Sequence, residues 1–162
     1  MTSIVRTERF SEVAVKSQNI VLFPQGLIGY ESYRDFVLIR SKQAPIFYWL
    51  QSLIRPDLCF LLVNPKRVWN RFNPRVSKED RGVLQFKNGR SLPTYLSIVR
   101  VDRRHRNIFA NLKSPIAINS SRRVAKQVVV ENEGYSVKFP IRKNAARKNR
   151  IRKESRLASL IL

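Results

Sequence analysis

The sequence has almost none of the side chains that most enzymes and metalloproteins need. Its 162 residues include one cysteine, one histidine and eleven acidic residues. Cys59 has no partner for a disulfide within the chain, and its place in the apolar run 58–63 predicts a small buried side chain rather than a nucleophile. Metal sites built from Cys and His need more of both residues. No metal or other cofactor is therefore expected.

Catalytic patterns are also missing. His105 lies among arginines at residues 103–106, and no Ser-His-Asp or Cys-His arrangement is legible around it. The acids are scattered singly, apart from Glu79-Asp80 and the pair within residues 131–133, which favours capping or solvated positions over paired catalytic carboxylates. No catalytic residue is predicted, and a binding protein is favoured over an enzyme.

Long hydrophobic runs are absent as well. No stretch approaches the roughly 18–20 apolar residues that span a bilayer, and residues 1–12 lack the apolar centre of a signal peptide. A cytoplasmic protein without a membrane span is therefore expected. The hydrophobic fraction of 43% is sufficient for a core, and a chain of this length is most simply one folded domain.

What the sequence has in excess is positive charge. Its 32 Lys and Arg residues give a formal net charge of +21 and an isoelectric point near 11.3. A protein with this charge binds polyanions at low salt through counterion release, so nucleic acid is expected as a non-specific partner. The charge fits equally well a protein whose affinity for nucleic acid is incidental, because no groove-reading motif or zinc site accompanies it.

Short strands dominate the predicted secondary structure. Apolar runs and alternation indicate one strand within residues 1–16 and others at 19–23, 36–39, 46–53, 58–63, 93–101 and 135–139. In the strand predicted at 93–101, Tyr95 should share a face with Ser97, Val99 and Val101. The aromatic residues at 46–53 could form a base-stacking platform, but few charges interrupt them, which favours core packing.

The stretch 108–130 is expected to be the structural centre of the chain. Residues 116–118 and 128–130 should form two antiparallel strands joined by the polar loop 119–123. Pro115 has no amide hydrogen, so it belongs at the beginning of a strand.

Helices are few in the prediction. Ser77 followed by Glu79-Asp80 resembles an N-cap with acids in the first turn, which predicts a helix within residues 76–86. Trp69 and Phe72 have the spacing of one face of a helical turn within residues 66–72. A further helical turn is expected at 32–36, and Asn88-Gly89 indicates a β-turn.

Two segments have features of a ligand-binding site. Residues 24–31 contain two glycines, but they lack the GxGxxG pattern and the Lys-Ser/Thr of a phosphate-binding loop, which favours a structural turn. Residues 141–162 carry eight Lys and Arg residues and one acid, and they follow a domain expected at 1–140. This basic C-terminal tail fits a solvated tail, a membrane-surface helix, an RNA-binding arm or a segment that docks on the body.

Four blocks of sequence together resemble the FliW flagellar assembly factor family, of which the chain would be a divergent and unusually basic member. Their order and spacing match the family over residues 4–141. The blocks are FPQGLIGYE at 23–31, WLQSL at 49–53 with PDLCF at 56–60, NLKSPIAIN at 111–119 and KQVVV at 126–130.

The resemblance implies a mainly β fold, a small antiparallel β-barrel-like domain with one or two short helices and no catalytic activity. Family members bind newly made flagellin in the cytoplasm. When flagellin is exported they bind the translational repressor CsrA, which couples flagellin synthesis to export. Such a switch requires two ligands whose binding is mutually exclusive. The resemblance and the sequence pattern together indicate five candidate partner-binding residues, which are Trp69, Arg71, Phe72, Asn111 and Asn119.

The chain departs from the family pattern in a few places. Ile28 stands where proline is common, Arg55 where an acid is usual and Ala125 where glycine is usual. Relatives are typically acidic, whereas a charge of +21 repels a basic repressor and attracts its RNA. The alternative function is therefore a basic RNA-binding or ribosome-associated module that has reused the fold.

Overall fold

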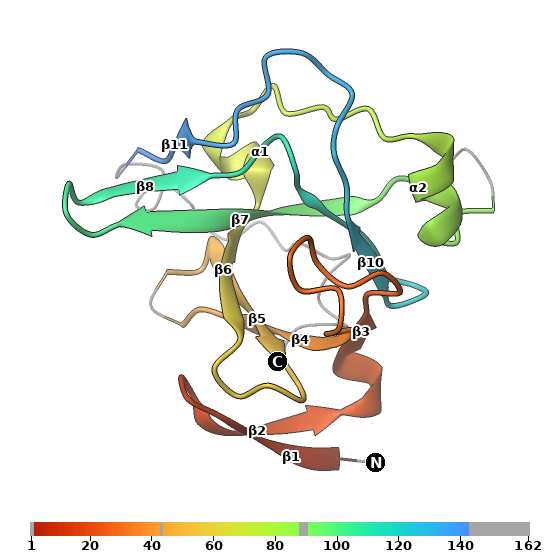
Figure 1. Ribbon diagram of the computed structural model, residues 1–162, viewed down its shortest axis with the longest axis vertical. Coiled ribbons are helices and arrows are strands. Elements are labelled where there is room, and N and C mark those ends of the chain that lie inside the picture. Colours follow the sequence, from red (N-terminus) through yellow and green to blue (C-terminus); the bar gives the residue numbers. More distant parts are fainter. Residues whose placement is uncertain (1, 43, 88–90, 143–162) are drawn as a thin grey trace.

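The computed structural model describes residues 2–42, 44–87 and 91–142, and a closed β-barrel forms its centre (Figure 1). In the described part of the chain, seven strands follow one another around the ring, and β9 pairs back with β7 to close it. The pairings are antiparallel except for β3 with β10, which is parallel. The ring consists of β3 (Ile20–Leu22), β4 (Asp35–Arg40), β5 (Phe47–Ser52), β6 (Cys59–Val63), β7 (Thr94–Asp102), β9 (Ile116–Asn119) and β10 (Val124–Gln127).

The remaining elements decorate this ring. Strands β8 (Asn107–Ala110) and β11 (Phe139–Pro140) extend the sheet outward from the second half of β7, which forms the arm on the left of Figure 1. A separate hairpin, β1 (Thr2–Thr7) with β2 (Ser11–Lys16), lies at the lower end, followed by the 3-10 turn η1 (Ser17–Asn19). The helices are α1 (Pro65–Val68) and α2 (Lys78–Val83). The predicted mainly β, barrel-like fold with one or two short helices is confirmed.

Alternate residues of the ring strands fill the barrel. Leu38, Leu50 and Leu96 belong to this inner cluster and are at most 1% exposed. The residues that alternate with these along each strand point outward. Tyr95 and Val99 of β7 accordingly pack together in a second cluster outside the ring, in agreement with the face that they were predicted to share. The aromatic runs of β5 and β6 are therefore mainly core material, as expected, and they pair with each other in antiparallel register.

The N-terminal segment differs from the prediction of one strand. It reverses at residues 8–10 and forms two strands, because Thr7 Oγ1 accepts a hydrogen bond of 2.9 Å from the Phe10 amide and Ser11 adopts φ 59°. Phe10 then packs edge-on against Trp49, and the Arg9 guanidinium lies 3.9 Å from the centre of the same ring. The reversal has no Gly, Pro, Asn or Asp, the residues that usually indicate a turn.

The central hairpin was predicted with its second strand too late in the chain. The strand is β10, and it ends at Gln127. The β9–β10 turn is tighter than expected because Arg123 adopts φ 56° within it. Val128 and Val130 are nevertheless buried, and their amides donate to the carbonyls of Pro115 and Lys113. Ile116 begins β9 immediately after Pro115, as predicted.

Two smaller predictions also change. Residues 32–36 form no helical turn, since β4 begins at Asp35. The last strand is confined to β11 and includes Pro140, whose missing amide is harmless at a sheet edge. The boundary expected after residue 140 stays a prediction, although Ile141 is 6% exposed and its amide donates to Ile108. Residues 143–162 and the predicted turn at Asn88-Gly89 lie outside the described residues.

Helix α2 begins where the sequence predicted. The Ser77 hydroxyl accepts a hydrogen bond of 3.1 Å from the Asp80 amide, and both Glu79 and Asp80 lie in the first turn. Asp80 also forms an ion pair with Lys126 of β10, which fastens the helix to the barrel. The predicted N-cap is therefore confirmed.

The loop 24–31 is a structural turn in the described structure, and the Ile28 amide donates to the Gln127 side chain of β10 at 3.1 Å. Gly26 and Gly29 adopt φ values of 68° and 82°. The Gly29 amide donates to the Glu31 carboxylate at 2.8 Å, and this hydrogen bond lowers the pKa of Glu31. A carboxylate thus occupies the position that a phosphate would need, which supports the structural reading of the two glycines.

The two glycines provide a matched pair of stability tests. A Cβ at Gly26 would lie 2.5 Å from the Glu31 Cα, whereas a Cβ at Gly29 would meet nothing within 4 Å. Gly29→Ala should cost about 1–2 kcal/mol of unfolding free energy because of its left-handed backbone. Gly26→Ala should cost more because it adds a backbone clash. Urea unfolding of both variants measures the difference, and equal losses would contradict this account of the loop.

Candidate partner-binding groove

The segment after α1 brings several aromatic rings together. Helix α1 begins at Pro65, where the Asn64 Oδ1 accepts the Lys66 amide at 3.0 Å, and it ends at Val68. Trp69 and Phe72 therefore lie beyond the helix, contrary to the prediction that they share a helical face. A backbone hydrogen bond of 3.1 Å from the Phe72 amide to the Trp69 carbonyl closes the turn between them.

Phe72 anchors this turn in the second core cluster. Its ring is 1% exposed and lies 5.7 Å from the ring of Tyr95 and 5.6 Å from that of Tyr135. Trp69 packs against Tyr135 at 5.0 Å and stacks on Phe139 at 5.7 Å. Of the candidate residues in this segment, Arg71 is exposed, Trp69 is half-buried and Phe72 is part of the core.

A groove of about 240 Å³ opens beside Phe72, between α1 and the beginning of β7. Prolines and aromatic residues make up half of its lining, and Leu92 in the same lining is 65% exposed. The lining residues are Asn64, Pro65, Lys66, Phe72, Asn73, Pro74, Leu92, Pro93, Thr94 and Tyr95. Sequence reasoning missed the β7 side of this groove, because the Leu92-Pro93 pair is visible in the sequence but the exposure of Leu92 is known only from the structure.

The chemistry of the groove suits an apolar protein segment. Burial raises the pKa of Tyr95 to about 12, so its hydroxyl stays neutral and can donate or accept a hydrogen bond. The backbone amide of Asn73, a lining residue, donates a hydrogen bond of 2.8 Å to the Tyr135 hydroxyl, which holds this part of the groove in place. Lys66 is exposed at the rim, and none of the lining residues is acidic. An apolar anchor with a nearby acceptor or carboxylate would find complementary groups here.

The two candidate asparagines hold turns. Asn111 accepts the Ser114 amide at 2.9 Å, and the next residue, Leu112, packs in the same cluster as Phe72. Asn119 lies elsewhere, at the end of β9, and is 5% exposed. Its amide donates to the Leu84 carbonyl at 2.8 Å, and its carbonyl accepts from the Ser121 hydroxyl at 2.8 Å. The structure thus brings four of the five candidate residues to one region and places Asn119 apart.

Reactive groups are few in the described ranges 2–42, 44–87 and 91–142. No cluster of three or more His, Cys, Asp or Glu residues that could hold a metal is found there. Burial raises the pKa of the half-buried Cys59 thiol to about 11, so the thiolate nucleophile is scarce at neutral pH. His105 pairs with Asp102 at 2.9 Å in an exposed turn. Within the described residues, no helix has the length and apolarity to cross a membrane.

The fold and the groove define a small β-barrel protein with a surface suited to protein partners. The family model described as FliW protein matches residues 4–141. The chain therefore belongs to the FliW family.

Individual relatives agree with this membership. The chain is 35% identical over 143 residues to the flagellar assembly factor FliW of Geobacter sulfurreducens, covering 88% of this chain and 89% of the relative. It is 31% identical over 146 residues to the corresponding factor of Leptospira interrogans, covering 88% and 95%. A crystal structure of the flagellar assembly factor FliW matches with a TM-score of 0.78 and 27% identity, over 86% of this chain and 96% of that chain.

The hydrogen bonds of Asn111 and Asn119 allow a test of whether each residue has a structural role or a binding role. Asn119→Ala removes a buried amide and leaves the Leu84 carbonyl unpaired, so it should lower the unfolding free energy by about 1–3 kcal/mol. Asn111→Ala removes one hydrogen bond at a half-buried turn and should cost about 0.5–1.5 kcal/mol. Urea unfolding measures both losses. An unchanged stability of Asn119→Ala would return that residue to the list of binding candidates.

Proposed function

We propose that the chain is a non-enzymatic flagellar assembly factor that binds flagellin in the cytoplasm and, after flagellin export, binds the translational repressor CsrA. Membership of the FliW family supports this proposal. The single structural observation that carries it is the apolar groove beside Phe72, where an exposed leucine borders an aromatic wall. Apolar groups of a protein partner typically seat in pockets with walls of this kind.

We place the flagellin contact in this groove. Interfaces draw most of their affinity from a few apolar anchors seated in pockets, and Leu92 with the Tyr95 wall offers such a seat. The groove is rigid on the α1 side, because Asn64 caps the helix and Asn132 Nδ2 donates to the Asn73 carbonyl at 3.2 Å. Rigid walls lower the ordering cost of binding.

The flagellin proposal predicts a complex that survives size-exclusion chromatography at micromolar concentrations and physiological salt. Leu92→Ser removes the exposed anchor and should weaken flagellin binding about tenfold or more, since burying a leucine is worth about 1.5–3 kcal/mol. Isothermal titration calorimetry with purified flagellin measures the change.

The matched control for this variant is Ile54→Ser. Ile54 is 67% exposed, close to the 65% of Leu92, but it lies in the β5–β6 loop and does not line the groove. Its loss should leave flagellin affinity unchanged. Equal weakening by both variants would remove the groove from the proposal, and the lack of any wild-type complex would overturn flagellin binding itself.

The CsrA part of the proposal makes a different electrostatic prediction. Salt screens repulsion between like charges, and the chain carries a net charge of +21. A complex with a basic repressor should therefore tighten as salt is raised, and flagellin should displace it. Competition titrations at low and high salt measure both effects. Binding that weakens steeply with salt would show instead that CsrA contacts an acidic surface or that contaminating RNA bridges the two proteins.

A further inference from the structure

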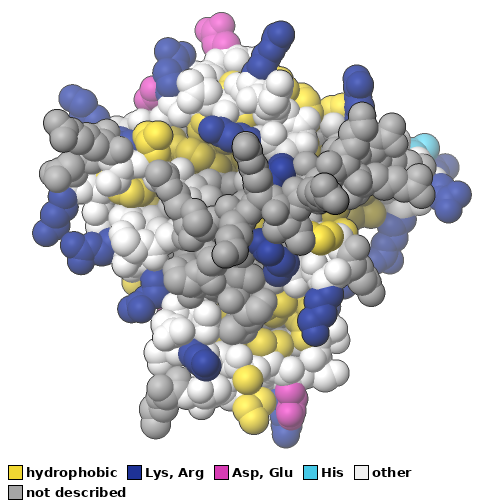
Figure 2. Space-filling view, turned by 180° about the vertical axis from the view of Figure 1, so that it is seen from behind, with side chains coloured by type: hydrophobic (Ala, Val, Ile, Leu, Met, Phe, Trp, Pro, Cys, Tyr) yellow, Lys and Arg dark blue, Asp and Glu magenta, His cyan; other side chains and the backbone are white. Residues whose placement is uncertain are grey.

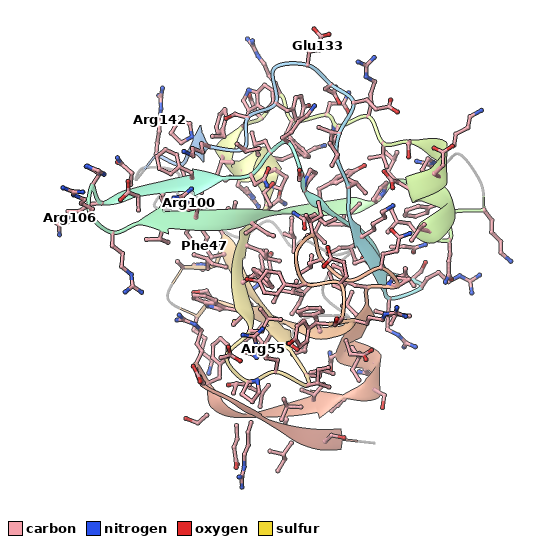
Figure 3. The ribbon with its side chains drawn as sticks, in the orientation of Figure 1. Phe47, Arg55, Arg100, Arg106, Glu133 and Arg142 are labelled. Atoms are coloured by element: carbon pink, nitrogen blue, oxygen red, sulfur yellow. The ribbon has the colours of Figure 1, made fainter. Side chains whose placement is uncertain are left out.

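The arm formed by β7, β8 and β11 has an outer face with a distinctive composition. The strand register places Arg100 opposite Phe109, and Phe109 opposite Pro140, so these three side chains form one row across the arm. Figure 3 shows Arg106 at the tip of the arm, with Arg100 on β7 and Arg142 just beyond β11. We call this surface the arm face, defined by Arg100, Arg106, Phe109, Pro140 and Arg142.

Phe109 is the unusual member of the arm face. It is only partly buried, it belongs to none of the core clusters, and its ring has no aromatic neighbour in the described part of the structure. A cavity of about 590 Å³ lies against it. The cavity is lined by Arg106, Asn107, Ile108, Phe109, Pro140, Ile141 and Arg142. A partly exposed aromatic ring and two arginines therefore line the same cavity.

Little of the arm's positive charge is neutralised from within, although Arg100 is close enough to Asp102 to contribute to the lowered pKa of that carboxyl. Among the described residues, no ion pair engages Arg100, Arg106 or Arg142. The acid of the hairpin, Asp102, is occupied by the His105 ring at 2.9 Å and the His105 amide at 3.2 Å, and these hydrogen bonds lower its pKa. Figure 2 shows, on the opposite side of the molecule from Figure 1, many Lys and Arg side chains with the few acids near the edges.

We propose that the arm face binds single-stranded RNA, with a base stacked on Phe109 and the neighbouring phosphates held by the arginines. Aromatic rings interleaved with basic side chains on one open face are the feature that lets a protein hold unpaired bases. Duplex bases are already stacked and present no free face to a ring. An acidic protein segment would satisfy the arginines but would leave the ring and its cavity unused. This inference stands independently of flagellin binding, which uses the other end of β7.

The test is fluorescence anisotropy with the full chain and a labelled oligouridylate of about 12 nucleotides, within the usual range of site sizes. The combined variant Arg100→Ala, Arg106→Asn and Arg142→Ala removes three charges; asparagine is chosen because Arg106 has φ 55°. Its affinity should fall about tenfold or more, and the slope of log affinity against log salt should become shallower by about 2.

A matched control removes three charges elsewhere. The combined variant Lys16→Ala, Arg34→Ala and Arg123→Asn changes three exposed residues, and Arg123 again has φ 56°. Its affinity for the same RNA should fall by less than about threefold, because only diffuse attraction is lost. Equal weakening by the two triple variants would overturn the proposal, since the charge would then act without a site.

The ring is tested separately by Phe109→Leu, which keeps apolar bulk and all charges. It should weaken oligouridylate binding about tenfold and leave the binding of a polyglutamate of similar length unchanged. No effect of Phe109→Leu on RNA, or polyglutamate binding as tight as RNA, would overturn the proposal in favour of an acidic protein partner. Flagellin binding by these variants should stay at the wild-type level, so failure of this inference is distinguishable from failure of the proposed function.

Discussion

Closure of the barrel through β7 is the constraint on which the rest of the structure depends. The first three residues of this strand, Thr94 to Leu96, pair with β9 and complete the ring, whereas its last four pair with β8 outside the ring. Between them, Ser97 and Ile98 pair with β6. One strand of nine residues thus belongs to the barrel at one end and to the arm at the other. Any change that unpairs β7 from β9 should disturb both surfaces.

The two surfaces at the ends of β7 have different chemistry. The groove contains Tyr95, Phe72 and several prolines, with one lysine at its rim, and it suits an apolar protein segment. The arm face contains three arginines and one partly exposed ring, and it suits a polyanion with flat bases. Because the strand is continuous and its centre is buried, the two sites are held at a fixed separation without sharing a residue. A protein partner and an RNA could therefore be bound by one chain at the same time.

Local signals in the sequence predicted the parts of the fold that depend on neighbouring residues. Ser77 and the acids after it specify the start of α2, and Pro115 specifies the start of β9. The N-terminal reversal was missed because a threonine hydroxyl replaces the usual turn residues. The buried valines after β10 have strand composition, but the strand pairing ends at Gln127, which only the partner strand determines.

The candidate site was predicted in part for the same reason. Trp69 and Phe72 were recognisable as aromatic residues in a polar stretch, but the burial of Phe72 depends on Tyr95 and Tyr135, which are distant in sequence. Leu92 lines the groove together with Pro65 and Lys66 of α1, which are distant in sequence. The pairing of Arg100 with Phe109 likewise needs the strand register. Side chains that meet across strands could not be assigned from spacing alone.

The most direct test of the central claim is hydrogen–deuterium exchange of the full chain with and without purified flagellin. Amides of residues 64–73 and 92–95 should exchange more slowly in the complex, because the groove would be covered, while amides of residues 100–109 should exchange at unchanged rates. Slower exchange confined to residues 100–109, with the groove unaffected, would contradict the assignment of separate sites to the two ends of β7.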